Sequence, residues 1–258
     1  MRLAERVALV HGAGGSVGGA VARAFAAEGA VVHLTGRTAE KVAATEREIR
    51  RRGGRARSYE VDVTDAEAVR RRTEEVLAEE GRVDILHNAV TYEEVQGAAL
   101  HTLEPEAVER TLVTATRAHL NTVRAVVPAM TGQGSGVIQT TVGFGPPYPL
   151  MGSTAIAWHT VEALYRQFAV ELGEFGIRVQ RFRTGGYRES VLNAPDYGSS
   201  YAGDSTPEDL LAGLEAGTPL HRLPSLDEAG AYAVFAASPD AASLTATAFN
   251  LTAGAVPD

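Results

Sequence analysis

A glycine-rich stretch follows the first apolar run of the chain and has the composition of an anion-binding turn. The stretch reads HGAGGSVGGA and contains Gly12, Gly15, Ser16 and Gly18. Glycines let a backbone turn tightly and approach a ligand closely, and the free N–H groups at a helix N-terminus attract phosphate. The stretch does not match a literal G-x-G-x-x-G, and glycine-rich turns also occur for packing. A pyrophosphate site and a packed turn therefore both remain open at this point.

Polar residues also follow the next three apolar runs. Arg37 lies in TGRT after the second run, Asp62 in EVDVTD after the third, and Asn88 in DILHNAV at the end of the fourth. Carboxyl ends of parallel strands meet at one edge of a sheet, where open α/β proteins bind ligands. A cation at Arg37 suits the 2′-phosphate of an adenosine ribose, whereas a carboxylate would suit a free hydroxyl. Each residue alone could be a strand-end cap, but together they favour a nucleotide site that prefers NADP(H).

Composition excludes several kinds of chemistry. The chain has no cysteine, so disulfides, thiolate nucleophiles and zinc–thiolate sites are absent, and no histidine pair has the spacing of a helical metal site. We therefore expect no metal site. A net charge of −8 argues against nonspecific nucleic-acid binding, and the basic runs 51–57 and 70–72 lack interleaved aromatic residues. The only lysine is Lys41.

The elements that position these residues follow from an alternation of short β-rich apolar runs with amphipathic stretches of helical length. This alternation is typical of a parallel sheet with crossover helices. The expected strands are Val7–His11, Val31–Thr35, Arg57–Val61, Ile85–Asn88, Val137–Thr141, Arg178–Arg183 and Ala248–Leu251. The expected helices are Ser16–Glu28, Ala39–Arg52, Ala66–Glu80, Pro105–Met130 and Ser153–Phe175. The expected fold class is α/β, a doubly wound parallel sheet of about seven strands with helices on both faces.

Length and hydropathy predict one soluble domain. The 258 residues suffice for one large α/β domain with a well-buried core. Apolar residues make up 45% of the chain and charged residues 22%, which is ordinary for a globular protein. No segment approaches the roughly twenty consecutive apolar residues of a membrane span, and the first ten residues resemble a strand rather than a signal peptide. We expect a cytoplasmic protein that does not bind membranes.

One segment interrupts the alternation. Residues 187–222 are rich in glycine, serine, proline and tyrosine, and a short helix is expected to begin at Thr206 and Pro207. The segment follows the sixth strand at the carboxyl edge of the sheet, so it is interpreted as a substrate lid. A surface insertion without function is the alternative.

These features resemble the short-chain dehydrogenase/reductase family, and the resemblance covers nearly the whole chain. The family's T-G-x-x-x-G-x-G is matched by residues 11–18, with His11 in place of the threonine and Ser16 in place of the middle glycine. The family's N-N-A-G is matched by residues 88–91, which keep only the first asparagine. The resemblance implies one Rossmann-type domain over residues 1–258, a nicotinamide cofactor, a small-molecule substrate and a homodimer or homotetramer.

The resemblance also implies that the family's catalytic groups have been replaced. Those groups are a serine, a tyrosine and, four residues after the tyrosine, a lysine, with an assisting asparagine. An ungapped match to VEALYRQFAVELGEFGIRV puts Thr154 at the tyrosine and Trp158 at the lysine. Stepping back from Thr154 to the end of the fifth strand puts Thr141 at the serine, and working back from RAVVPAM puts Ala115 at the asparagine. Only a hydroxyl, at Thr141, would remain. Trp158 could be core packing or a stacking wall for a flat ligand.

A tyrosine elsewhere could replace the missing acid. Tyr148 and Tyr187 both lie in segments that border the pocket in this family, whereas Lys41 lies on the adenosine side. A phenol with a pKa of about 10 is a poor base at neutral pH but a usable hydrogen-bond donor. Further polar residues near the strand ends, His87, Glu93, Glu94 and His159, are expected to be structural or solvated.

Three functions remain. The favoured expectation is non-redox chemistry, such as isomerisation, dehydration or cyclisation of a small apolar metabolite, with ordinary alcohol oxidation or ketone reduction not expected. The first alternative is NADPH-dependent reduction of a polarised C=C, C=N or C=O bond with a relocated or substrate-supplied acid. The second alternative is a noncatalytic partner subunit of an active relative.

Overall fold

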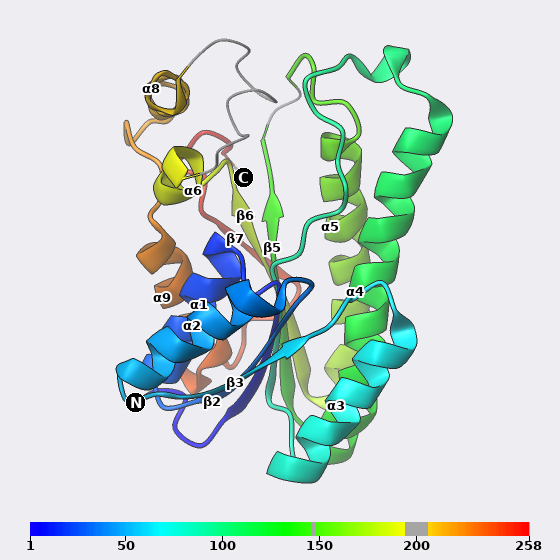
Figure 1. Ribbon diagram of the computed structural model, residues 1–258, viewed down its shortest axis with the longest axis vertical. Helices are drawn as coiled ribbons and strands as arrows, with labels where there is room; N and C mark the ends of the chain where they lie inside the picture. The colour runs from blue at the N-terminus through cyan, green and yellow to red at the C-terminus, as the bar shows by residue number, and fades with distance from the viewer. Residues whose placement is uncertain (146–147, 194–205, 258) are drawn as a thin grey trace.

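The computed structural model describes residues 1–145, 148–193 and 206–257 and contains one seven-stranded sheet covered on both faces (Figure 1). The strand order is β3-β2-β1-β4-β5-β6-β7, and every pair of neighbours is parallel. The predicted doubly wound parallel sheet is confirmed. Among the described residues, no helix is both long and apolar enough to cross a membrane.

The bounds of the elements lie close to those expected from sequence. The strands are β1 Val7–His11, β2 Val31–Gly36, β3 Arg55–Glu60, β4 Ile85–Asn88, β5 Gly136–Gly143, β6 Ile177–Thr184 and β7 Thr247–Asn250. The helices are α1 Ser16–Ala27, α2 Ala39–Arg51, α3 Ala66–Glu80, α4 Pro105–Gln133, α5 Thr154–Leu172, α6 Arg188–Asn193, α8 Pro207–Ala216 and α9 Leu226–Ala237. Short 3-10 turns lie at Leu100–Thr102, Gly173–Phe175 and Pro239–Ala241.

Local signals fix where several helices begin. The Asp65 carboxylate caps α3 by accepting from the N–H groups of Glu67 and Ala68. Reciprocal side-chain and backbone bonds of the capping-box type begin α8 at Thr206 and α9 at Ser225. These caps satisfy N–H groups that lack intrahelical partners, so the sequence pattern alone locates the helix starts.

Two apolar layers flank the sheet. Helices α1, α2 and α9 cover one face, and helices α3, α4 and α5 cover the other (Figure 1). Side chains of successive strand residues alternate between these layers: on β5, Ile138 packs against the α4 and α5 layer, whereas Val137 packs against the α1 and α9 layer. Both faces are buried, which explains the near-continuous apolar run of β1.

The chain order reverses between β1 and β4, because β2 and β3 lie on one side of β1 and β4 to β7 lie on the other. The helices that follow β1 and β4 therefore cover opposite faces of the sheet, and a crevice opens between the carboxyl ends of these two strands. The register pairs His11 with Asn88 at this edge. The fold thus places the glycine-rich turn and the end of β4 side by side.

A buried carboxylate at the opposite end of β4 ties this strand to β1. Asp84 accepts hydrogen bonds from the Val7 N–H at 2.9 Å, from Arg6 at 2.8 Å and from Arg82 Nε at 2.8 Å. Burial raises the pKa of Asp84, but the bonds from Arg82, Val7 and Arg6 outweigh burial and lower it. A group whose pKa is lowered by folding stabilises the fold above its ordinary pKa and loses that contribution as the pH falls through the folded value.

The Asp84→Asn variant is therefore expected to lower the free energy of unfolding at neutral pH by about 1–3 kcal/mol. Chemical denaturation from neutral pH down to strongly acidic pH measures this loss, which should shrink as the wild-type carboxyl becomes protonated. Asp65→Asn is the matched control, because asparagine caps a helix about as well as aspartate. An equal loss in the two variants would contradict this account of Asp84.

Candidate active site

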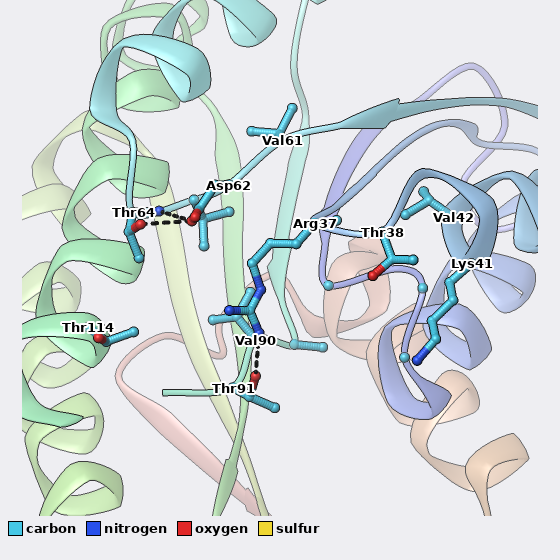
Figure 2. Close-up of a pocket in the computed structure, with 16 residues that line it drawn as sticks. Arg37, Thr38, Lys41, Val42, Val61, Asp62, Thr64, Val90, Thr91 and Thr114 are labelled. Atoms are coloured by element: carbon cyan, nitrogen blue, oxygen red, sulfur yellow. Dashed lines mark hydrogen bonds between the residues drawn. The ribbon is translucent and has the colours of Figure 1, made fainter. Parts of the chain in front are cut away.

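A cavity of about 240 Å³ opens at the carboxyl edge of the sheet, where the ends of β1 to β4 meet (Figure 2). Its walls come from the glycine turn, the start of α2, the residues after β3 and the residues after β4. It is lined by Gly12, Gly14, Gly15, Gly36, Arg37, Thr38, Lys41, Val42, Val61, Asp62, Val63, Thr64, Ala89, Val90, Thr91 and Thr114. Of the seven predicted cofactor-binding residues, Gly12, Gly15, Arg37 and Asp62 line this cavity.

The glycine turn is shaped by close backbone contacts. Gly12 has φ +78°, and a Cβ atom there would overlap the carbonyl of Ala89. A Cβ atom at Gly18 would overlap the carbonyl of Gly12, so α1 can pack against the turn only with glycine at that position. Gly15 is the N-cap of α1 and offers no capping side chain, so the first N–H groups of the helix are left for an anion.

Three polar side chains, those of Arg37, Thr38 and Lys41, line the cavity between the end of β2 and the first turn of α2. Arg37 is 58% exposed, its guanidinium lies 3.5 Å from the Thr91 hydroxyl, and its other terminal nitrogen lies 3.9 Å from Glu93. Figure 2 shows Arg37 reaching across the cavity toward Thr91, with Thr38 and Lys41 approaching from the start of α2. The donor set and the glycine cradle fit the adenosine and phosphate groups of a dinucleotide.

Asp62 lies at the β3 side of the cavity with one carboxylate oxygen already committed. Its Oδ1 atom accepts from the backbone N–H of Thr64 at 2.9 Å and from the Thr64 hydroxyl at 2.8 Å (Figure 2). These two bonds form an Asx turn that fixes the direction of the side chain. Asp62 is therefore a rigid polar wall residue beside Val61 and Val63.

Asn88, Ser16 and Gly18 do not line this cavity. Asn88 is fully buried, and its amide donates to the hydroxyls of Thr122 and Tyr165, each at 2.8 Å. Ser16 lies on the outer side of the glycine turn, where its hydroxyl is 2.8 Å from that of Ser190 on α6. Their roles as cofactor contacts stay predictions.

The residues at the family's tyrosine and lysine positions lie near the start of α5. Thr154 is 2% exposed, and its hydroxyl has no hydrogen-bond partner among the described residues. Trp158 lies one turn later, against the end of β5. A Cβ atom on Gly143 would overlap the indole ring of Trp158, so Gly143 is the residue of β5 that faces this side chain.

The surroundings of the Thr141 side chain differ from those of Thr154. Its hydroxyl lies 3.5 Å from His87 Nε2, and the ring of His87 packs near Phe25 and Phe182 in the α1 and α9 layer. Burial lowers the pKa of His87 to about 4, and the Gln139 hydrogen bond offsets this in part. His87 is thus a neutral core residue, in agreement with its expected structural role.

The two tyrosines that could act as a relocated acid differ sharply. Tyr148 is 58% exposed. Tyr187 is 2% exposed, and its hydroxyl lies near Thr141 and Thr184 without a bond of good geometry among the described residues. Burial raises the pKa of Tyr187, and the neighbouring hydroxyls offset the rise only in part. The structure brings Thr141 and Tyr187 together, apart from Trp158.

Several residues that line the cavity were not predicted as site residues. Gly14, Thr38, Lys41, Thr91 and Thr114 all line the cavity. Lys41 stands four residues after Arg37, in the first turn of α2, so the short spacing in GRTAEK carried a signal for a second cation near the first. Thr114 lies on α4, and no pattern in the sequence connects it to the glycine turn.

Comparison with known proteins identifies relatives over most of the chain. A family model described as Enoyl-(Acyl carrier protein) reductase matches residues 12–255. The A-factor type gamma-butyrolactone 1′-reductase (1S-forming) of Streptomyces virginiae is 31% identical over 196 residues, which cover 74% of this chain and 75% of that protein.

Solved structures agree with the fold. The NAD⁺-bound xylitol dehydrogenase is 26% identical, with a TM-score of 0.86 over 98% of this chain and 100% of that one. A variant of actinorhodin polyketide ketoreductase with NADPH is 24% identical, with a TM-score of 0.87 over 97% of each chain. At this identity, the second likeness supports the fold alone.

The names of these relatives contradict the function that was favoured from the sequence. The relatives are called reductases and dehydrogenases, so the prediction of non-redox chemistry is wrong, and the reductive alternative is the better supported one. They support an enzyme, but they do not support the expectation that ordinary alcohol or ketone chemistry is excluded. The prediction was wrong because it relied on the replaced side chains at the catalytic positions and gave too little importance to the cavity lined by the glycine turn. The match over residues 12–255 and the parallel seven-stranded sheet show that the chain belongs to the short-chain dehydrogenase/reductase family.

Proposed function

We propose that this protein is an NADPH-dependent oxidoreductase that reduces a polarised C=C, C=N or C=O bond of a small molecule. The observation that carries the proposal is the cavity whose lining brings the glycine turn together with Arg37 and Lys41. A cleft without a cofactor would have no need for two cations at the ribose end. The reductases among the relatives support the same activity.

Each part of the cleft has a distinct task in this proposal. The N–H groups at the start of α1 hold the pyrophosphate, and Arg37, Thr38 and Lys41 hold the 2′-phosphate. NADPH supplies the hydride. The indole of Trp158 and the end of β5 wall the space beyond the phosphates, and they orient a flat or apolar substrate by packing.

Thr154 is proposed to hold the substrate oxygen or nitrogen. Its buried hydroxyl lacks a partner among the described residues, and a buried donor without a partner costs free energy unless a ligand satisfies it. The proton itself then comes from the substrate or from water, because no lysine stands near α5 to lower the pKa of a neighbouring hydroxyl.

Residues 187–222 are proposed to close over the substrate. Arg188 on α6 forms an ion pair with Glu215 on α8 at 2.7 Å, and a small cluster of Val191, Leu211 and Leu223 packs these helices together. Residues 194–205 of the segment lie outside the described residues. Assembly as a homodimer or homotetramer is proposed as well, on the strength of the family alone.

Thr154→Val tests the role of the hydroxyl. The variant should lower kcat/KM by about tenfold, the worth of one neutral hydrogen bond, with NADPH affinity and stability unchanged. Thr160→Val is the matched control: its hydroxyl lies on the same helix and already donates to the Ile156 carbonyl at 2.9 Å, so kcat/KM should stay unchanged. Equal activity of wild type and Thr154→Val would remove Thr154 from the proposal.

The proposed activity itself is tested by the consumption of NADPH in the presence of ketones, enones and imines. Substrate-dependent consumption with at least one class is expected, and it should exceed consumption with NADH. Saturable NADPH binding without consumption for any class would refute the proposed reduction.

A further inference from the structure

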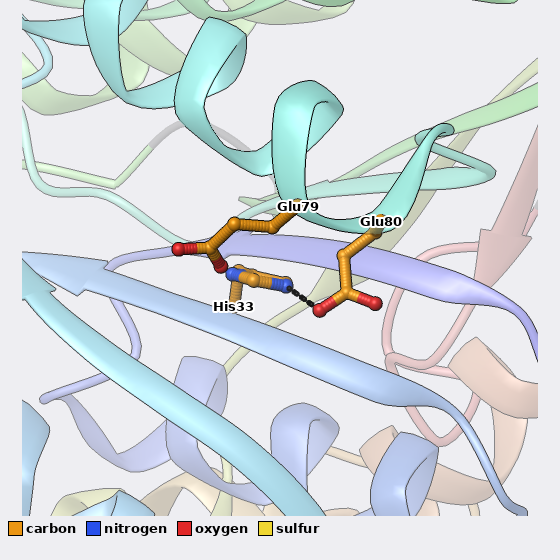
Figure 3. Close-up of side chains that lie close together, drawn as sticks. All are labelled: His33, Glu79 and Glu80. Atoms are coloured by element: carbon orange, nitrogen blue, oxygen red, sulfur yellow. Dashed lines mark hydrogen bonds and ion pairs between the residues drawn. The ribbon is translucent and has the colours of Figure 1, made fainter.

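Away from the cleft, a buried imidazole lies against two carboxylates between β2 and the last turn of α3. The side chain of His33 on β2 is fully buried, while those of Glu79 and Glu80 are 40% and 22% exposed. Figure 3 shows the two carboxylates beside opposite ends of the His33 ring, with the bond drawn between His33 and Glu80. One ligand atom from each of the three residues lies within 4.8 Å of the other two.

The imidazole is held in a fixed orientation by a partner on its other nitrogen. His33 Nδ1 lies 3.3 Å from the Tyr59 hydroxyl, and Nε2 lies 3.2 Å from Glu80 Oε1. The Tyr59 ring is parallel to the imidazole within 2°, and the guanidinium of Arg72 lies 3.7 Å from the centre of that ring. A histidine that ligates a metal normally donates its other N–H in this way, which fixes the tautomer and the ring direction.

The charges of the cluster favour a cation. Glu79 Oε2 accepts from Arg57 at 2.6 Å, so one arginine faces two carboxylates. The two carboxylates carry one more charge than this arginine, so one negative charge is left over beside the imidazole.

Nε2 of His33 and Oε1 of Glu80 face each other, and they repel unless a proton or a metal ion lies between them. If Nδ1–H donates to Tyr59, the lone pair of Nε2 is free to bind a metal.

We propose that His33, Glu79 and Glu80 form a binding site for a divalent transition metal ion, with Zn²⁺ as the representative ion. One imidazole nitrogen and two carboxylates form a ligand set found at zinc sites, with bonds of about 2.0–2.2 Å. The partly exposed glutamates can swing inward to reach these lengths, and water can complete the coordination. The ion fastens α3 to β2, so the site is independent of the proposed reductase activity. No metal site was expected from the sequence, because the chain has no cysteine and no histidine pair with the spacing of a helical site, whereas this set joins a strand to a helix.

Calorimetric titration of the metal-free protein with ZnCl₂ tests the site. Wild type should bind one Zn²⁺ at this site, and both His33→Gln and Glu79→Gln/Glu80→Gln should weaken that binding at least about tenfold. His33 is buried, so its replacement can disturb folding. The titration of the double glutamate variant therefore gives the decisive result. Glu74→Gln, on an exposed turn of the same helix, is the control and should bind as wild type does.

Thermal unfolding gives a second measure that does not depend on activity. Zn²⁺ should raise the Tm of wild type and of Glu74→Gln, because the ion binds the folded state, but not that of the double variant. MgCl₂ should have no such effect, since magnesium prefers oxygen ligands alone. Failure to bind Zn²⁺, or binding equal in wild type and the double variant, would overturn the proposed site.

Discussion

Replacing Gly143 with alanine is expected to lower the free energy of unfolding by about 1–3 kcal/mol, the usual cost of overpacking a tightly packed site. The added Cβ atom would overlap Cε2 and Cζ2 of Trp158. The strand end cannot move freely, because β5 is paired along its whole length with β6 up to the contact between Gly143 and Thr184. Either the indole must leave its position or the end of β5 must separate from β6. Urea denaturation of the two proteins measures the loss.

Two further variants distinguish the effect of this contact on stability from a general effect of replacing glycine. Gly132→Ala, in α4 with no atom near its added Cβ, should be neutral or stabilising by up to about 1 kcal/mol. Trp158→Leu in the Gly143→Ala background should recover most of the loss, because the smaller side chain leaves room for the methyl group. A Gly143→Ala protein as stable as wild type, or one that Trp158→Leu does not rescue, would contradict the packing described for this wall.

Arg37→Glu is expected to reverse the nucleotide preference. NADPH affinity should fall by at least about tenfold, or about 1.4 kcal/mol, because a cation facing the 2′-phosphate becomes an anion. The effect is limited by the exposure of Arg37, at 58%, since water screens exposed charges. NADH affinity should be maintained or increased, because a carboxylate suits a free ribose hydroxyl. Calorimetric titration with both nucleotides gives the ratio.

A matched cation on the same face of the fold provides the control. Arg47 lies on α2, is 62% exposed and pairs with Glu40 at 2.7 Å, outside the residues that line the cavity. Arg47→Glu should therefore leave both affinities nearly unchanged. A parallel loss of NADPH affinity in the two variants would mean that net charge, rather than a contact at Arg37, sets the preference.

The fold could be predicted because its signals are local and repeated. Apolar runs of strand length, capped helices and the glycine turn each depend on neighbouring residues, and the order in which they occur specifies a parallel sheet. Part of the lining of the cavity was predictable for the same reason: Gly12, Gly15, Arg37 and Asp62 lie within a few residues after the ends of β1, β2 and β3, and strand ends meet at one edge.

The residue of β5 that lies opposite Trp158 could not be predicted with the same success. Stepping back from Thr154 to the end of the fifth strand put Thr141 at the family's serine position. In the structure, Thr141 faces His87, whereas Gly143, two residues further along β5, contacts Trp158. Residue spacing across a loop does not resolve a shift of two residues. For Asn88, the position at the end of a strand was predicted, but the burial of its side chain against Thr122 and Tyr165 was not.

The most direct test of the central claim is the transfer of deuterium from NADPH labelled at the hydride-donating carbon of its nicotinamide. The purified protein is incubated with the labelled nucleotide and a panel of ketones, enones and imines, and the products are analysed by mass spectrometry. The proposed function predicts one deuterium atom in the product for each NADPH oxidised, with far less product from labelled NADH. A product that forms without deuterium, or NADPH that binds and is never oxidised, would contradict it.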